Sequence, residues 1–451
     1  MEIKILDVLE AEVKPAFAAI IRPVLSYPAV YYQQGPYRKI RKEYEKSVMR
    51  KGTNCSYFYT GLVSRVLKYC QERGIEVEVK GKPETLEATK KPCLKNIELR
   101  EEQVRLITKA IKQQRGVLVA PTGVGKTLLG LAVISAFPNV KVLWLCHTKD
   151  LMYQASDFAQ KHLENFKVGY IGDSYYNPEQ LTIATRQSFI KCASEIGIDY
   201  DIVIIDETHH LAKQVGQYST ILQEVFAPVR IGLTATMPKS KEAILTIEGL
   251  LGPIIDEVSI REGQERAIMA DIKIRFLKIP QNLRLRELRK YSEVYDAAIV
   301  NRKEQHEIIA LTAKKHVEQN ESVLILVSQI EHGNNILAEC RRQGIETEFA
   351  QGSTEGEIRT QLKEALNDKH IKCVIATAIW YEGVNLPELN VIVNAAGGKS
   401  EIRTIQTIGR GLRLTERKKT LIFYDCLDTS HNYLVSHIAE RLCIYSEMGW
   451  L

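Results

Sequence analysis

Short apolar runs alternate with segments of helical periodicity from about residue 97 to the end of the chain. Buried runs separated by helix-length segments are the signature of parallel α/β sheets. Two such blocks lie on either side of residues 261–266, a short, polar, glycine-containing segment that we expect to be a hinge. The expected strands are 116–120, 141–146, 181–185, 202–205 and 230–234 in the first block, and 273–280, 322–327, 346–350, 372–377, 391–394 and 421–424 in the second.

The beginning of the chain has a different pattern, with shorter apolar runs and several tyrosines. A helical stretch at 60–72 precedes a strand-like alternation at 74–80. We therefore predict an α/β protein in three parts. A small α/β accessory domain at 1–92 precedes two tandem parallel-sheet domains, at 93–265 and 266–451.

A phosphate-binding loop follows the first expected strand of the first block. Residues 120–127 read Ala-Pro-Thr-Gly-Val-Gly-Lys-Thr and lead into a helical pattern at 128–137. In this context backbone N–H groups point at a triphosphate, Lys126 reaches the β- and γ-phosphates, and Thr127 ligates Mg²⁺. The candidate ATP-binding residues of the loop are Pro121, Thr122, Gly123, Val124, Gly125, Lys126 and Thr127.

Two acids end a later strand of the same block, where the run at 202–205 leads into Asp206-Glu207-Thr208-His209. Asp206 is placed to hold magnesium, and Glu207 to orient and deprotonate the water that attacks the γ-phosphorus. We expect His209 to carry a signal between the nucleotide and the domain interface. A zinc site with His210 is disfavoured, because adjacent histidines point in different directions and no further ligands lie nearby.

Two arginines near the end of the chain, Arg410 and Arg413, are three residues apart and so share one face of an expected helix. A guanidinium delivered to the γ-phosphate from another domain stabilises the transition state only when the domains close. We predict that both arginines are catalytic.

The composition, with 45% apolar residues and a net charge of +6, is that of a soluble globular enzyme. The amino terminus lacks a secretion signal, and no apolar run approaches the roughly 20 residues of a membrane span, so we expect a cytoplasmic protein without a membrane partner. The nine cysteines include no C-x-x-C pair, which favours neither a metal site nor disulfides.

The positive charge gathers in the first 95 residues, which carry 18 Lys and Arg against 11 Asp and Glu. It peaks at 38–51, next to several tyrosines, and basic side chains neutralise phosphates while tyrosines stack on exposed bases. The alternative is a solvated helix face. A nuclease site on Glu78 and Lys80 is disfavoured, because it needs clustered carboxylates. The predicted DNA contacts of this stretch are Arg38, Lys39, Arg41 and Lys42.

Taken in order, these motifs resemble those of the superfamily 2 DExH helicases, and the resemblance covers the chain from about residue 97 onward. It implies two RecA-like domains that use ATP and Mg²⁺. Leu99-Arg100-x-x-Gln103 resembles the motif ahead of the phosphate loop, which implies that Arg100 and Gln103 bind ATP, with Gln103 at the adenine edge. Thr234-Ala235-Thr236 resembles the motif that links the ATP and nucleic-acid sites.

The same resemblance implies further site residues in both RecA-like domains. Those implied to bind ATP are Gly383 and Gln406. Those implied to contact nucleic acid are His147, Thr148, Thr185, Gln187, Ser328 and Thr377.

Within the superfamily, the tail Tyr424-Asp425-Cys426-Leu427-Asp428 and the segment Gly61-Leu62-Val63 are similar to phage UvsW-type branch-migration helicases. This similarity implies an ATP-dependent DNA helicase or translocase on branched DNA, in replication, recombination or repair, with duplex or branched DNA as partner. If the protein is phage-encoded, we expect it in the cytoplasm of the host cell. Two alternatives stay open: the motor subunit of a restriction or remodelling assembly, and an ATP-gated annealing clamp.

Overall fold

The computed structural model divides into two compact units, one made of Met1–Pro121 with Gly125–Val258 and the other largely of Ser259–Leu451. The structure describes residues 1–34, 39–121, 123–212, 215–266, 268–352, 354, 356–377, 386–399, 401–409, 411, 412, 414, 415 and 418–451. The predicted site residues outside this part are Arg38, Thr122, Gly383, Arg410 and Arg413, together with the side chains of Lys39 and Gln406.

The first unit begins with a five-stranded sheet in the order β5-β6-β2-β1-β7. Its strands are β1 (Glu2–Ile5), β2 (Glu10–Val13), β5 (Arg50–Lys51), β6 (Ser56–Tyr59) and β7 (Glu78–Lys80). Its helices are α1 (Pro15–Ile21), η1 (Arg22–Leu25), η2 (Thr60–Leu62) and α2 (Val63–Gln71). The predicted helix at 60–72 is thereby confirmed, and of the strand expected at 74–80 only β7 pairs with a neighbour.

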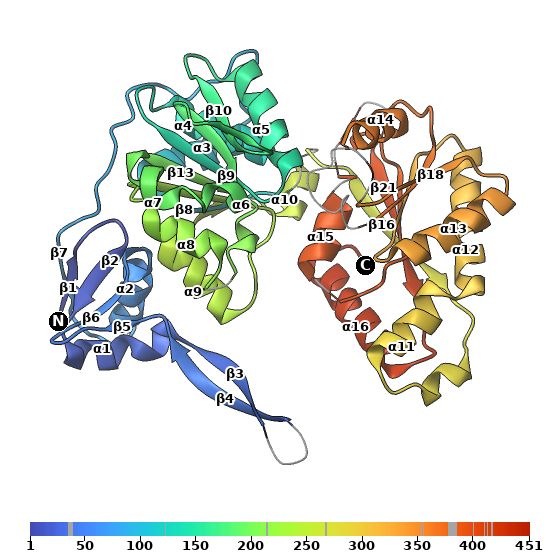
Figure 1. The fold of residues 1–451 in the computed structure, drawn as a ribbon, viewed down its shortest axis with the longest axis horizontal. Helices are drawn as coiled ribbons and strands as arrows, with labels where there is room; N and C mark the ends of the chain where they lie inside the picture. Colours follow the sequence, from blue (N-terminus) through green and yellow to red (C-terminus); the bar gives the residue numbers. More distant parts are fainter. Residues whose placement is uncertain are drawn as a thin grey trace. The chain divides into compact units, whose positions relative to one another are not determined.

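A two-stranded hairpin of β3 (Ser26–Gln34) and β4 (Lys39–Ser47) extends away from this sheet (Figure 1). It carries most of the basic stretch that the sequence singled out. The alternative of a helix face is therefore wrong for these residues. The reason lies in the pairing, because nine antiparallel residue pairs hold the two strands together from Ser26 and Ser47 outward.

The rest of the first unit is an eight-stranded sheet in the order β11-β10-β12-β9-β13-β14-β8-β15. Helices α3 to α5 cover one face and α6 to α9 the other (Figure 1). The strands are β8 (Arg115–Val119), β9 (Val142–Cys146), β10 (Val168–Gly172), β11 (Tyr175–Asn177), β12 (Leu181–Thr185), β13 (Ile202–Asp206), β14 (Val229–Thr234) and β15 (Ile254–Glu257). The helices are α3 (Glu101–Gln113), α4 (Lys126–Ser135), α5 (Lys149–His162), α6 (Arg186–Phe189), α7 (Ala193–Ile196), η3 (Gly197–Asp199), η4 (Thr208–His210), α8 (Gln217–Glu224) and α9 (Lys241–Leu250).

The second unit holds a six-stranded, all-parallel sheet in the order β16-β21-β20-β17-β19-β18. Its strands are β16 (Asp271–Lys278), β17 (Val323–Leu326), β18 (Thr347–Ala350), β19 (Cys373–Ala376), β20 (Val391–Asn394) and β21 (Thr420–Leu427). Its helices are α10 (Ile260–Glu265), η5 (Leu283–Glu287), α11 (Tyr291–Tyr295), η6 (Asp296–Val300), α12 (Lys303–Glu318), α13 (Ile330–Arg342), α14 (Gly356–Asn367), α15 (Glu401–Gly409) and α16 (Asn432–Glu447). No helix in the described ranges is long and apolar enough to cross a membrane.

The predicted α/β architecture with two parallel sheets is confirmed, and each strand expected in either block is present with ends that shift by a few residues. The sequence pattern missed β11 and β15, which lie at the two edges of the sheet, where the apolar signal is weak. It also missed β10, whose apolar run is interrupted by two glycines. The segment expected to be a hinge, 261–266, lies mostly in a short helix, α10 (Ile260–Glu265). The Ser259 side chain caps this helix by accepting a hydrogen bond from the backbone N–H of Glu262.

The accessory sheet docks on α9 of the same unit. Leu245 of α9 is buried in the accessory core, and Arg65 forms a two-pronged ion pair with Glu248, with nitrogen–oxygen distances of 2.5 and 2.7 Å. Gly61 lies against the backbone carbonyls of Glu248 and Gly249, so that an added Cβ would overlap them. The contact therefore requires a residue without a side chain at position 61.

We expect Gly61→Ala to destabilise this docking by about 1–3 kcal/mol, because a methyl group cannot enter a contact made by backbone atoms. Limited proteolysis of the accessory domain and the thermal unfolding midpoint would report the loss. Gly352→Ala is the matched control, since no atom of the described residues lies within 4 Å of an added Cβ there. Equal behaviour of the two variants would contradict the role given to Gly61.

A buried histidine in the second unit predicts a pH dependence of stability. His332 on α13 is fully buried, and among the described residues neither ring nitrogen has a hydrogen-bond partner. Burial, followed by the nearby His306, lowers the pKa of His332 from 6.5 to about 3. The unfolded chain therefore binds a proton that the folded state excludes, so that stability is lost as the pH falls below 6.5, by about 1.4 kcal/mol per unit.

We expect His332→Leu to remove this contribution, so that the variant loses less stability than the wild type between pH 7.5 and 5.5. Denaturant unfolding at both pH values measures the difference. His370→Leu, at an exposed position, serves as the control. An unchanged pH dependence in His332→Leu would show that this histidine is not the group that titrates.

Candidate nucleotide site

The loop between β8 and α4 has the backbone that a phosphate site requires. Gly123 and Gly125 have φ values of +105° and +95°, a region that residues with a side chain rarely adopt. Gly125 is the residue immediately before α4. The N–H groups of the first turn of α4, which have no acceptor within the helix, therefore point toward the loop. The amino end of a helix attracts anions through these groups and through its dipole.

Lys126 and Glu207 meet across the carboxyl edge of the sheet. β14 lies between β8 and β13 in the sheet, and the segments that follow β8 and β13 carry the two residues. Lys126 Nζ lies 3.3 Å from Glu207 Oε1, and both side chains are largely buried. The structure thus brings together the predicted phosphate-binding lysine and the predicted general base.

Asp206 ends β13 beside this pair and is almost fully buried. Its pKa rises from 3.8 to about 7, chiefly because burial disfavours the charged carboxylate and also because Glu207 repels it, while Lys126 opposes the rise. A cation next to Asp206 would reverse this effect. The surroundings of Asp206 are therefore chemically suited to a cation, and the magnesium ligands expected from the sequence, Asp206 and Thr127, stay a prediction.

The described part of the chain contains no group of three or more histidine, cysteine, aspartate or glutamate side chains that could hold a metal ion. The two adjacent histidines instead have separate contacts. His209 Nδ1 lies 3.3 Å from Thr234 Oγ1 and 3.4 Å from Glu207 Oε2. This contact joins the predicted general base to the Thr234-Ala235-Thr236 motif, where Thr234 Oγ1 donates to the Thr236 carbonyl over 2.9 Å.

His210 makes a connection that the sequence did not reveal. Its ring stacks on His147, with centroids 3.6 Å apart and planes 5° from parallel. Arg186 Nη1 lies 3.0 Å from His147 Nδ1. The segment after β13 thus contacts His147, and through it Arg186, in the two segments that the sequence assigned to nucleic acid. The sequence could not show this contact, because it depends on the strand order, in which β9 lies between β12 and β13.

Gln103 lies next to the phosphate loop. Its amide nitrogen is 3.5 Å from the position that a Cβ on Gly125 would occupy, and its oxygen accepts the Arg100 backbone N–H over 2.9 Å. The Arg100 side chain pairs with Glu102 at 2.8 Å. Gln103 is buried, and its predicted contact with adenine stays a prediction.

Within the eight-stranded sheet of the first unit, the predicted nucleic-acid contacts follow β9 and β12, which are neighbours, whereas Arg41 and Lys42 lie on β4 of the hairpin. Thr148 caps α5 by accepting the Leu151 N–H over 3.3 Å, and Thr185, which is buried, donates to Ser188 over 3.1 Å. Gln187 is exposed. Ser328 and Thr377 follow β17 and β19, which are also paired, in the second unit.

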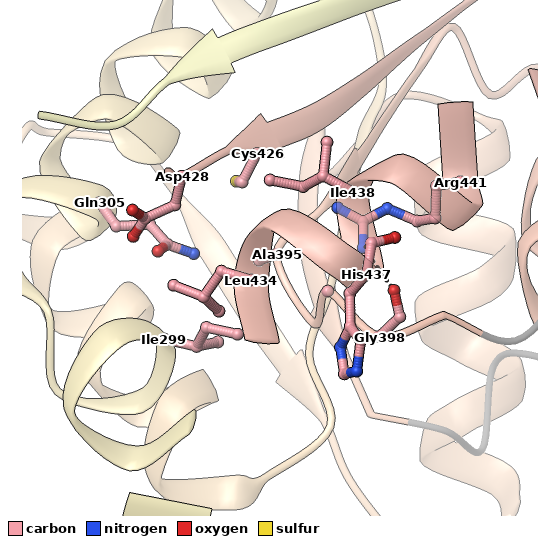
Figure 2. Close-up of a pocket in the computed structure, with 11 residues that line it drawn as sticks. Ile299, Gln305, Ala395, Gly398, Cys426, Asp428, Leu434, His437, Ile438 and Arg441 are labelled. Carbon is pink, nitrogen blue, oxygen red and sulfur yellow. Dashed lines mark hydrogen bonds between the residues drawn. The ribbon is translucent and has the colours of Figure 1, made fainter. Parts of the chain in front are cut away.

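A cavity in the second unit lies between α16 and the end of β21 and is lined by residues such as Ile299, Cys426, Leu434 and Arg441 (Figure 2). Its volume of about 30 Å³ suits a molecule of the size of water and excludes a nucleotide. Arg441 is buried at its rim and donates to Asp425 over 2.7 Å, while Tyr445 donates to the same carboxylate over 2.9 Å. This region holds α16 against the sheet.

Comparison with known proteins gives the same picture of the chain. Residues 96–239 match the type III restriction enzyme res subunit family, and residues 303–415 match the helicase conserved C-terminal domain. The DNA 3'-5' translocase XPB2 of Sulfurisphaera tokodaii is 28% identical over 392 residues, which cover 79% of this chain and 87% of that protein. The ATP-dependent DNA helicase uvsW of Enterobacteria phage T4 is 24% identical over 429 residues, or 86% of this chain and 85% of that protein.

Among solved structures, the Hef helicase domain of Pyrococcus furiosus superposes with a TM-score of 0.52, covers 77% of this chain and 100% of that domain, and is 18% identical. This likeness concerns the fold. The two family matches together span more than half of the chain, and the named relatives are helicases and translocases. The chain therefore belongs to the superfamily 2 helicases, with two RecA-like domains, and is an ATP-hydrolysing nucleic-acid helicase.

Proposed function

We propose that this helicase uses ATP and Mg²⁺ to drive branch migration of forked or four-way DNA in replication, recombination or repair. The observation that carries the proposal is the attachment of the basic amino-terminal domain to α9 of the ATP-binding unit through Gly61, Arg65 and Leu245. A DNA-binding element fixed to the motor moves with it. The match to the phage T4 DNA helicase uvsW, which extends over 86% of this chain, supports the same conclusion.

In the proposed mechanism, the phosphate loop and Lys126 bind the triphosphate, and Glu207 accepts the proton of the attacking water. Asp206 and Thr127 would hold magnesium, which would neutralise phosphate charge. The second RecA-like domain would contribute Arg410 and Arg413 to the transition state, so that hydrolysis depends on domain closure. His209 and the stacked His210 and His147 would connect the nucleotide to the DNA-contacting segments.

ATP hydrolysis measured with single-stranded, duplex, forked and four-way DNA, and with matched RNA, tests the proposal. We expect forked and four-way DNA to stimulate hydrolysis most, and the purified chain to dissociate a four-way junction with ATP. Stronger stimulation by linear duplex or by RNA would contradict it. Release of the DNA with ATP but without directional movement, as expected of an ATP-gated clamp, would also contradict it.

The second candidate is the motor subunit of a restriction or remodelling assembly, which the res-subunit family match to residues 96–239 favours. Such a motor moves along duplex without separating strands and depends on partner proteins. Displacement of a triplex-forming strand from linear duplex, without junction dissociation, would support this candidate over branch migration.

A further inference from the structure

The hairpin of β3 and β4 sorts its side chains onto two chemically different faces. Tyr31 pairs with Lys42, and Tyr32 pairs with Arg41. Residues directly opposite each other share a face, and successive residues alternate between faces. One face, called the basic face here, therefore carries Tyr27, Tyr31, Lys42, Tyr44 and Lys46, and the opposite face carries Val30, Tyr32, Arg41, Glu43 and Glu45.

The charges separate in the same way. Among the hairpin side chains that the structure describes, both glutamates lie on the opposite face, where Arg41 Nη2 donates to Glu43 Oε1 over 2.7 Å. Lys42 and Lys46 give the basic face two positive charges and no acidic residue of the hairpin itself, while Glu242 of α9 lies near Lys46 at the inner end. The opposite face has Arg41 against two glutamates, and the register adds position Lys39 to it, so that its positive and negative residues balance. Only the basic face is electrostatically suited to a polyanion.

Two tyrosine rings lie open on the outer half of the basic face. Tyr31 and Tyr44 contact each other edge to face, with centroids 5.7 Å apart, and each is 46% exposed. The inner half is anchored on the motor, because the buried Tyr27 donates to Glu242 of α9 over 3.1 Å and Lys46 lies 5.8 Å from the Tyr27 ring centroid. The face that carries the exposed rings is therefore attached to α9 at its inner end.

This combination selects one kind of ligand. Lysines by themselves would bind the phosphates of duplex DNA equally well. In a duplex, however, each base is stacked between its neighbours, so its face cannot contact a tyrosine ring. Base faces become available to an aromatic ring only where the strand is unpaired. An exposed ring pair beside two lysines therefore fits an unpaired nucleic-acid strand.

We propose that the basic face of the hairpin binds an unpaired strand segment, with bases stacked on Tyr31 and Tyr44 and phosphates near Lys42 and Lys46. The inference rests on the proposed function, since unpaired segments arise where the arms of branched DNA separate. It assigns the tyrosines to base stacking and the lysines to the backbone.

The test uses the 451-residue chain without ATP and two oligonucleotides. One is a gapped duplex with a fluorescent adenine analogue in the gap, and the other is its fully paired counterpart. We expect Tyr31→Ala with Tyr44→Ala to weaken binding to the gapped DNA by about tenfold or more and to abolish the fluorescence change on binding. The paired duplex should bind almost as before. Tyr31→Phe with Tyr44→Phe should retain both signals, because phenylalanine keeps the ring.

Tyr32→Ala is the matched control, since Tyr32 is 66% exposed on the same hairpin but lies on the opposite face. An equal loss in Tyr32→Ala, or unchanged gapped-DNA binding in the double alanine variant, would overturn the proposal. So would loss of self-association in that variant without loss of gapped-DNA binding, since the face would then join two copies of the chain. Sedimentation velocity measures this last outcome.

Failure of this inference and failure of the proposed function give different results. If forked DNA stimulates ATP hydrolysis by the wild type but the double alanine variant binds gapped DNA normally, the hairpin assignment alone fails. If the fluorescence change depends on the tyrosines but forked and four-way DNA stimulate ATP hydrolysis no more than linear duplex, the proposed branch migration is contradicted. The binding of an unpaired strand by the hairpin is then still supported.

Discussion

Replacing Glu207 by glutamine is expected to slow ATP hydrolysis by about 10²- to 10⁴-fold, the range that a general base contributes, while ATP still binds. The Lys126 ammonium lies 3.3 Å from the carboxylate that the variant neutralises, so the lysine is freed for the phosphates and ATP affinity should not fall. Lys126→Ala should instead lose both binding and hydrolysis, because it removes the cation that faces the phosphates.

Single-turnover hydrolysis at saturating DNA, together with equilibrium binding of a fluorescent ATP analogue, separates the two effects. Glu195→Gln, an exposed position in the same unit, is the control for removing one negative charge. Normal turnover in Glu207→Gln would exclude its role as the base. Loss of ATP binding in that variant would mean that Glu207 organises the loop.

Replacing Arg441 by methionine is expected to have the largest effect on stability, a loss of about 3–5 kcal/mol, because it leaves the carboxylate of Asp425 buried without its counter-charge. The Arg441 and Asp425 side chains are 3% and 1% exposed, and their hydrogen bond is 2.7 Å long. The expected fall in the unfolding midpoint of the second unit is roughly 10 °C.

The double variant Asp425→Asn with Arg441→Met should recover much of this stability, because both charges are then absent. Tyr445→Phe, which removes only one hydrogen bond to Asp425, should cost about 1 kcal/mol. Scanning calorimetry of the three variants measures the comparison. Equal loss in the single and double variants would show that the effect comes from packing rather than from the buried charge.

The parallel sheets could be predicted because their strands are buried on both faces and so appear as continuous apolar runs, such as 181–185 and 391–394. The edge strand β11 escaped because all its residues are exposed, and its neighbour β10 because two glycines interrupt its apolar run. The accessory domain was the least predictable part. Its basic stretch is dense in charge, which is also typical of a solvated helix face, and only the pairing with β3 shows that it forms a strand.

The sequence by itself determined the parts of the nucleotide site that depend on neighbours in the chain. The phosphate loop needs glycines at positive φ directly before a helix, and Asp206 and Glu207 need the end of a buried strand, so residue type and spacing suffice. Tertiary structure alone decided which segments meet across the sheet, as in the stack of His210 on His147 and the docking of Gly61 on α9. It also decided which hairpin side chains share a face, because that depends on strand register, and a shift of one residue would exchange the two faces.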